Sequence, residues 1–132
     1  MERAFPATID AIAQLVELIG EEAEAARLPK QHAQRLQVAV EEAAVNISSH
    51  AYGAAPGEIR VRTRVANDQF AIDLEDDGPP FDPLTAEAPD VTLDLDRRER
   101  GGLGVMLIRR FTDEIRYRRD GSHNVLTLVV NR

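Results

Sequence analysis

Apolar residues in the first part of the chain recur every three or four positions, which is the spacing of one buried helix face. After an extended start around Phe5, a first stripe follows the candidate N-caps Thr8 and Asp10 and comprises Ile12, Leu15, Val16, Ile19 and Ala23. A second stripe starts after Pro29 and comprises Ala33, Leu36, Ala39, Val40, Ala43, Ala44 and Ile47, before Gly53 ends it. The pattern therefore predicts two amphipathic helices, the second of them long.

The hydrophobic period then changes to two. Apolar positions in 59–65 alternate with Arg60, Arg62 and Arg64, which predicts a half-buried strand with one face of guanidinium groups. That face either docks an acidic partner or lies in solvent. A turn at 67–68 leads into the alternating run 70–76, so the two strands should form an antiparallel hairpin in which Asp76 ends the inward-facing row.

Periodicity is absent from 79–100, a segment rich in proline, aspartate and arginine, and a connection of this length is more often a functional lid than a simple crossover. After it we expect a short helix at 104–111 and strands at 114–118 and 125–130. The 132 residues contain no internal repeat, so a single domain spanning 1–132 is expected.

Composition excludes several classes of function. The chain has no cysteine, which removes disulfides, thiolate metal sites and cysteine nucleophiles. Its net charge of −7 argues against a surface that neutralises nucleic-acid phosphates. We see neither an apolar run long enough to span a membrane nor a secretory signal at the start, so no membrane contact is expected and the expected location is the cytoplasm.

Three short motifs carry candidate chemistry. In the second helix, Glu42 and Asn46 are four residues apart and so project from one face. An amide oxygen is a suitable Mg²⁺ ligand, and a carboxylate one turn away is placed to accept a proton. The competing interpretation is a solvated polar pair. At the end of the second strand, the Asp76 carboxylate suits the amino group of adenine, and Gly78 would let the backbone pass close to the ring, although Asp-Gly is also a common turn.

The third motif is a glycine-rich loop, Gly101, Gly102, Leu103 and Gly104, just before the third predicted helix. Successive backbone N–H groups at a helix start attract phosphates, although glycine there is often only a helix stop signal. The histidines 32, 50 and 123 are too scattered for a metal motif, and we assign all three to structural roles. Each motif alone is weak, and their common order is what makes them informative.

In order and spacing the motifs resemble the N, G1 and G2 boxes of the Bergerat-fold ATPases, the histidine-kinase-like superfamily. Within it, EEAAVNISSHAY and GGLGVMLIRRFTDEIRYRR are similar to the anti-sigma-factor serine-protein kinases. The resemblance implies an α+β fold, a two-layer α/β sandwich with helices packed on a mixed, mainly antiparallel sheet. It also implies an ATP lid at about 79–100.

By the same resemblance, Glu42 matches the general base, Asn46 the magnesium ligand and Asp76 the adenine-binding acid. The phosphate loop matches Gly101 to Gly104, with Gly78 beside the base, and Arg100, or else Arg97 or Arg98, is placed to reach the terminal phosphate. Pro80 stands where the superfamily usually has a second G1 glycine, which should stiffen the first hinge of the lid.

The function implied is that of a homodimeric anti-sigma factor and serine/threonine-protein kinase, a transferase that uses ATP and Mg²⁺. It would regulate transcription by sequestering a sigma factor, and it would phosphorylate a serine of a STAS-type antagonist. The alternative is a non-catalytic ATP-dependent binding module, which Pro80 keeps open. A histidine-kinase role lacks support, because no helix pair carrying a phosphoacceptor histidine precedes the motifs.

Overall fold

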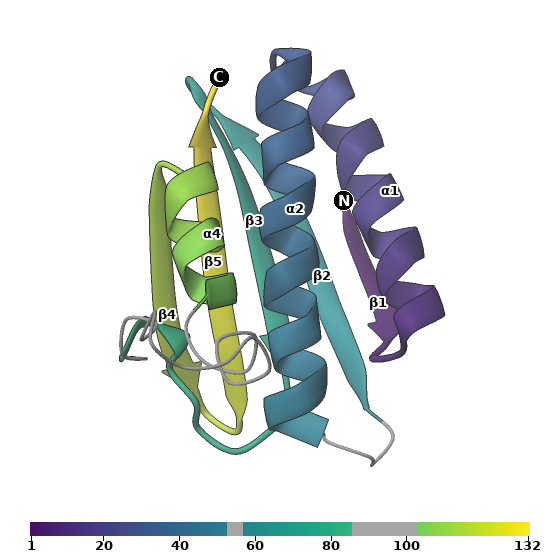
Figure 1. Ribbon diagram of the computed structural model, residues 1–132, viewed down its shortest axis with the longest axis vertical. Coiled ribbons are helices and arrows are strands. Elements are labelled where there is room, and N and C mark those ends of the chain that lie inside the picture. The colour runs from purple at the N-terminus through teal and green to yellow at the C-terminus, as the bar shows by residue number, and fades with distance from the viewer. Residues whose placement is uncertain (53–56, 86–102) are drawn as a thin grey trace.

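The computed structural model describes residues 1–52, 57–85 and 103–132 as three helices lying on one face of a five-stranded sheet (Figure 1). The helices are α1 (Ile9–Ala25), α2 (Lys30–Ile47) and α4 (Leu103–Phe111), and α2 lies between the other two. The strands are β1 (Glu2–Pro6), β2 (Glu58–Ala66), β3 (Gln69–Asp76), β4 (Glu114–Asp120) and β5 (His123–Asn131). This is the two-layer α+β architecture that the sequence predicts.

The sheet order is β1-β2-β3-β5-β4, and all four neighbouring pairs are antiparallel. The expected mixed character is therefore absent from the pairings of these strands. The tight turn between β4 and β5 makes these two strands an antiparallel hairpin, and β5 then pairs with β3 on its other side. Strands β3 and β4 run in the same direction but lie on either side of β5, so they do not pair with each other.

The helix stripes form the core as the periodicity predicts. Side chains that are 0% exposed, among them Leu15 and Ile19 of α1 and Leu36 and Val40 of α2, join those of the inner sheet face in one cluster. The Thr8 hydroxyl caps α1 by accepting a hydrogen bond from the Ala11 N–H at 3.2 Å. No helix among the described residues is both long enough and apolar enough to cross a membrane.

Helix α2 does not end in an ordinary helical turn. Its last α-helical residue, Ile47, is followed by a π-helical turn, Ser48–Tyr52, where the sequence predicts a continuous helix up to Gly53. The Ser48 hydroxyl donates a hydrogen bond to the Ala7 carbonyl at 3.1 Å, and the Tyr52 hydroxyl donates one to the Glu58 carbonyl at 2.6 Å. Wider turns of this kind often occur at functional sites, and here the turn meets the end of β3.

Candidate functional site

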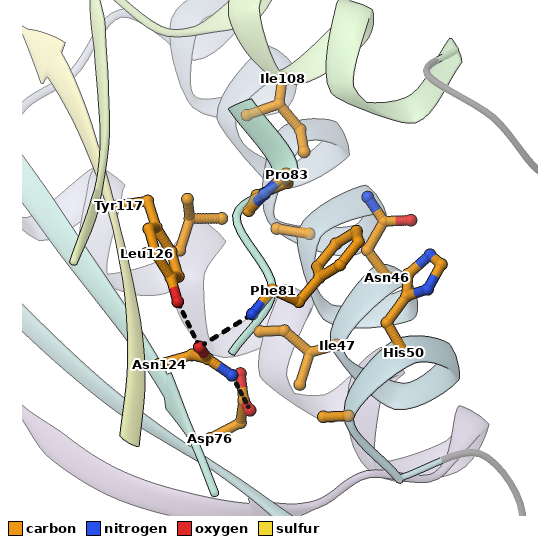
Figure 2. Close-up of a pocket in the computed structure, with 12 residues that line it drawn as sticks. Asn46, Ile47, His50, Asp76, Phe81, Pro83, Ile108, Tyr117, Asn124 and Leu126 are labelled. Carbon is orange, nitrogen blue, oxygen red and sulfur yellow. Dashed lines mark hydrogen bonds between the residues drawn. The ribbon is translucent and has the colours of Figure 1, made fainter. Parts of the chain in front are cut away.

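A pocket lies between the C-terminal half of α2 and the sheet (Figure 2). Its walls are mostly apolar, as is usual for a small-molecule site. The helical layer and the 81–83 segment contribute Ala43, Asn46, Ile47, His50, Ala51, Phe81, Pro83 and Ile108, and the strands contribute Asp76, Tyr117, Asn124 and Leu126. The fold thus brings two of the predicted site residues, Asn46 and Asp76, to one cavity.

Asp76 carries the buried carboxylate of this pocket and is only 4% exposed. Its Oδ1 atom accepts hydrogen bonds from the Gly78 N–H at 2.8 Å and from Asn124 Nδ2 at 3.0 Å. The described residues offer no hydrogen bond to its Oδ2 atom. A buried acceptor without a partner costs free energy unless a ligand donates to it, so Oδ2 suits an exocyclic amine.

Gly78 brings the strand end close to the π-helical turn. A Cβ added to Gly78 would lie 2.6 Å from the Cα atom of Ala51, a backbone atom that cannot move aside. Glycine is therefore required for the chain just after β3 to pass this close to the π-helical turn at the pocket rim. The sequence predicts that the Gly78 backbone passes close to a bound adenine ring, whereas the close neighbour in the structure is this turn.

Glu42 lies beside the start of α4. A Cβ added to Gly104 would come within 2.8 Å of Glu42 Oε2, so the first turn of α4 approaches the carboxylate closely. Partial burial raises the pKa of Glu42, and the nearby charge of Glu41 raises it further. Asn46 is one turn further along the same helix, and its amide has no hydrogen-bond partner among the described residues. The first and third motifs therefore meet at the pair α2 and α4.

The remaining predicted residues fall mostly outside the described part of the chain. Arg97, Arg98, Arg100, Gly101 and Gly102 lie there, as does most of the predicted lid. Leu103 is the first residue of α4 and Gly104 the second. Pro79 and Pro80, at the start of the predicted lid, are separated from the end of β3 by Asp77 and Gly78.

The sequence patterns assign no ligand-binding role to four polar or aromatic residues of the pocket. Asn124 and Tyr117 come from the last hairpin, and Phe81 comes from the turn after β3. The fourth is His50, whose ring stacks on the Phe81 ring with centroids 4.3 Å apart. His50 was assigned a packing or capping role, and it does pack, but against the pocket wall. Phe81 lies three residues after Gly78, and this closeness to the second motif is the only sequence feature that points to it. Nothing in the hydrophobic periodicity points to Asn124.

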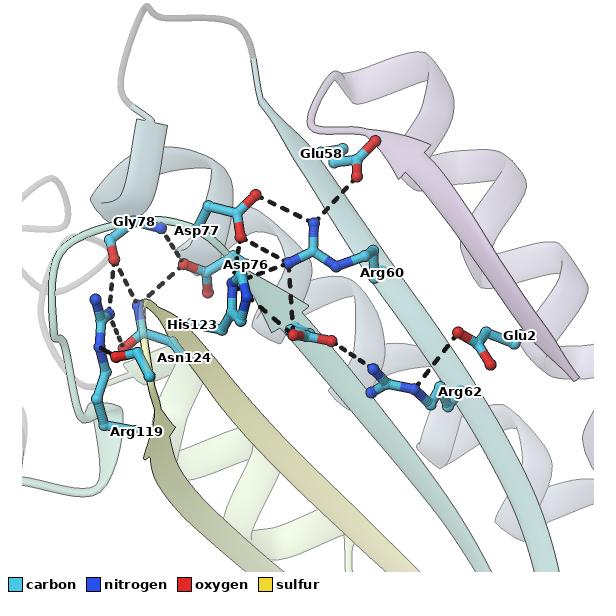
Figure 3. Close-up of polar contacts among 12 residues, drawn as sticks. Glu2, Glu58, Arg60, Arg62, Asp76, Asp77, Gly78, Arg119, His123 and Asn124 are labelled. Carbon is cyan, nitrogen blue, oxygen red and sulfur yellow. Dashed lines mark hydrogen bonds and ion pairs between the residues drawn. The ribbon is translucent and has the colours of Figure 1, made fainter.

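The arginine face of β2 lies on the side of the sheet away from the helices and is paired with carboxylates of β3 (Figure 3). Arg60 donates to Asp77 at 2.7 Å, Arg62 to Glu75 at 2.7 Å and Arg64 to Asp73 at 2.7 Å. Burial is the largest single influence on Asp73 and Glu75 and opposes their ionisation, but the hydrogen bonds they accept and the nearby arginine charges together outweigh it, so the pKa of each carboxyl is lowered. These arginines belong to ion pairs within the sheet.

The residues present fit a magnesium nucleotide. The apolar walls and the open Oδ2 atom of Asp76 suit an adenine ring, and the unpartnered amide of Asn46 offers a hard oxygen ligand at the pocket edge. Glu42 and Gly104 lie side by side beyond Asn46, where a terminal phosphate would be expected. The arrangement can bind a purine nucleotide and hold a carboxylate near its phosphates.

Fold and site together define an ATPase domain of the histidine-kinase type. The family model described as the histidine kinase-like ATPase domain matches residues 5–130, and the chain belongs to this family. More particularly, the chain is 33% identical over 95 residues to the serine/threonine-protein kinase BtrW of Bordetella bronchiseptica, covering 71% of this chain and 67% of that protein. It is 36% identical over 105 residues to the serine-protein kinase RsbW of Bacillus licheniformis, covering 74% of this chain and 64% of that protein.

These kinase relatives agree with the family recognised in the motifs, and the match spans about two thirds of their length. Among solved structures, the chain resembles the RsbU and RsbW domains of Rv1364c from Mycobacterium tuberculosis with a TM-score of 0.68 and 17% identity, over 99% of this chain and 32% of that one. The histidine kinase AdeS of Acinetobacter baumannii gives a TM-score of 0.54 at 13% identity, over 99% and 67% of the two chains. At these identities the structural likeness shows the fold alone.

Proposed function

We propose that the chain is a Mg·ATP-dependent serine-protein kinase that phosphorylates a small antagonist protein and sequesters a sigma factor. The observation that carries the proposal is the convergence of the three motifs around α2. Asp76 and Asn46 share one pocket, and Glu42 lies against Gly104. The kinase names of the relatives support the same activity.

In this proposal the adenine ring enters the apolar pocket and donates its amino group to Asp76 Oδ2. Asn46 would hold the magnesium ion, which neutralises phosphate charge when bound. The backbone N–H groups of 101–104 would bind phosphate oxygens, and Arg100 would reach the terminal phosphate, within a lid of about 79–100. These assignments follow the family motifs and the positions of the described residues.

The proposed role of Glu42 is that of general base toward the serine hydroxyl of the antagonist. Its burial and its raised pKa make the carboxylate more basic than an exposed glutamate. The rest of the rate enhancement is expected from positioning the hydroxyl and the phosphate, since phosphoryl transfer needs little covalent help from the protein.

The partners in this proposal are a sigma factor and a STAS-type antagonist that competes for the kinase. A homodimer in the cytoplasm completes the proposal, and it rests on the family resemblance alone. The alternative, a binding module without catalysis, shares the ATP pocket and differs only in the role of Glu42.

The test is phosphoryl transfer from γ-labelled ATP with Mg²⁺ to candidate STAS-type proteins encoded in the same genome. We expect phosphoserine on one of them and formation of a complex with a sigma factor in pull-downs. Bound ATP without phosphoserine on any of these proteins would contradict the kinase and leave the binding module. Absence of ATP binding would contradict both.

A further inference from the structure

Asn124 lies at the start of β5, opposite Asp76 in the β3–β5 register, and is only 4% exposed. Its amide nitrogen donates to three acceptors, and its amide oxygen accepts from three donors. Figure 3 shows the contacts with Asp76, Gly78 and Arg119, and Figure 2 shows those with Tyr117 and Phe81. The acceptors are Asp76 Oδ1 at 3.0 Å, the Pro79 carbonyl at 2.9 Å and the Gly78 carbonyl at 3.4 Å. The donors are the Tyr117 hydroxyl at 2.6 Å, Arg119 Nη1 at 3.2 Å and the Phe81 N–H at 3.3 Å.

The surroundings of Asn124 are divided into an acceptor side and a donor side. The acceptor side consists of oxygen atoms from the last residue of β3 and the turn after it, and the donor side consists of two β4 side chains and the Phe81 N–H. A primary amide satisfies both sides because it carries N–H donors and a carbonyl acceptor on one planar group. Aspartate has the same shape but no donor for the first side, so the environment specifies asparagine.

One consequence concerns Asp76. Asn124 Nδ2 and the Gly78 N–H both bind Oδ1, which fixes the rotation of the carboxylate and leaves Oδ2 without a donor among the described residues. Figure 2 shows the hydrogen bond between Asn124 and Asp76. A second consequence concerns the turn after β3, where Asn124 holds the Pro79 carbonyl and the Phe81 N–H. Phe81 thereby places its ring against His50 on the pocket wall.

We propose that Asn124 is a positioning residue of the nucleotide site, which orients the Asp76 carboxylate and fixes the turn that carries Phe81. The inference rests on the proposed function, that this pocket binds ATP. Asn124 touches the groups that meet the base and has no role in phosphoryl transfer. The effect that the inference predicts for this residue is therefore on nucleotide affinity.

The test is the variant Asn124→Asp, with the ATP dissociation constant measured by calorimetry at about pH 8 and about pH 5.5 for variant and wild type. At the higher pH the two carboxylates repel and Asp76 is displaced, so the variant should bind roughly tenfold more weakly. At the lower pH one proton shared between the carboxyls replaces the Nδ2–H donor. The ratio of the variant's ATP dissociation constant to that of the wild type should then fall toward one. Because both constants are measured at the same pH, the ratio cancels the titration of ATP itself.

Arg119 lies against Asn124 Oδ1, and its guanidinium is present in both proteins. The next titratable pair, Asp77 with His123, is also the same in both proteins, so the pair formed by Asp76 and the new carboxyl is what differs between them. The matched control is Tyr117→Phe. This variant removes the Tyr117 hydroxyl that donates to Asn124 Oδ1 and keeps both N–H donors of the Asn124 amide. It should weaken ATP binding less than about threefold, equally at both pH values.

A ratio near one at both pH values overturns the inference, and so does a pH-independent loss, which indicates a structural role only. If Asn124→Asp does not fold, Asn124→Thr provides one hydroxyl donor in place of the amide, and full wild-type affinity in that variant overturns the inference. Failure of the wild-type chain to bind ATP contradicts the proposed function and with it the inference. Wild-type binding with an indifferent variant contradicts the inference alone.

Discussion

Among individual residues, Glu42 has a raised pKa and lies beside the start of α4. Burial is the larger cause of the raised pKa, and the negative charge of Glu41 is the smaller one. A general base must be ionised to act, so transfer should increase as the pH rises through the pKa of Glu42. Glu41 is exposed and does not line the pocket, so in the proposed mechanism it would change the pKa of the base without touching the nucleotide.

We expect Glu42→Gln to reduce phosphoryl transfer by roughly 10²–10⁴-fold while the ATP dissociation constant changes little, because the amide keeps the shape and loses the base. The matched control, Glu41→Gln, should retain transfer and move the acid limb of its pH profile to lower pH, since one cause of the raised pKa is removed. Single-turnover transfer measured across the pH range tests both variants. Unchanged transfer in Glu42→Gln would exclude this glutamate as the base.

The candidate site could be predicted in part at this scale. Glu42, Asn46 and Asp76 were nominated because their residue types and spacing match known chemistry within single elements. Asn124 and His50 were not, since an asparagine in a strand and a histidine near a helix end have many ordinary roles. Their contacts depend on which elements the fold brings against them.

Among the elements, the contact between α2 and α4 controls where Glu42 can lie. Gly104 occupies the first turn of α4, and its missing side chain leaves room for the Glu42 carboxylate. Gly20 provides a comparison, because it is also helical and a Cβ there would meet only the flexible Gln37 side chain, away from the pocket.

We expect Gly104→Ala to preserve or raise the melting temperature, since alanine favours a helix by about 1 kcal/mol over glycine. The added methyl group displaces the Glu42 carboxylate, and a misplacement of this size typically costs roughly 10²-fold in rate. Gly20→Ala should leave transfer unchanged. Thermal melts and transfer assays on both variants test this, and full activity in Gly104→Ala would show that the carboxylate tolerates the displacement.

Most element boundaries followed from periodicity, because each helix or strand buries one face. The π-helical turn Ser48–Tyr52 was not predicted, since its contacts are with Ala7, Glu58 and the end of β3. The antiparallel pairing throughout was also missed, because strand order depends on where β5 inserts. Val65 was assigned to the inner face and is 47% exposed near the hairpin end.

For the whole molecule, rows of arginine and carboxylate on the outer sheet face make stability depend on pH. The pKa values of Asp73, Glu75 and Asp77 are lowered in the fold, from ordinary values of 3.8 for aspartate and 4.5 for glutamate. Burial opposes this for all three carboxyls, and the hydrogen bonds they accept together with the nearby positive charges outweigh it. The unfolded chain thus takes up protons at higher pH than the folded one, so stability falls on acidification below about pH 4.5.

We expect the free energy of unfolding to decrease between about pH 4.5 and pH 3 and to decrease less in Asp73→Asn, which removes one of these carboxyls. The variant should also be less stable near neutral pH, because Arg64 and Thr127 lose an ionised partner. Asp68→Asn, in the exposed hairpin turn, is the matched control. Urea titrations at each pH provide the measurement, and equal pH slopes for all three proteins would contradict the assignment.

The sequence by itself determined the helices and most strand positions, because burial of one face leaves a period of 3.6 or 2 in the chain. It also determined the three motifs and their order, since each motif lies within a few consecutive residues. Only the tertiary structure decided that β5 lies between β3 and β4, and that choice places Asn124 and Tyr117 beside Asp76. The pairing of the β2 arginines with the β3 carboxylates was decided in the same way. Such contacts join residues far apart in the chain, where no local periodicity records a partner.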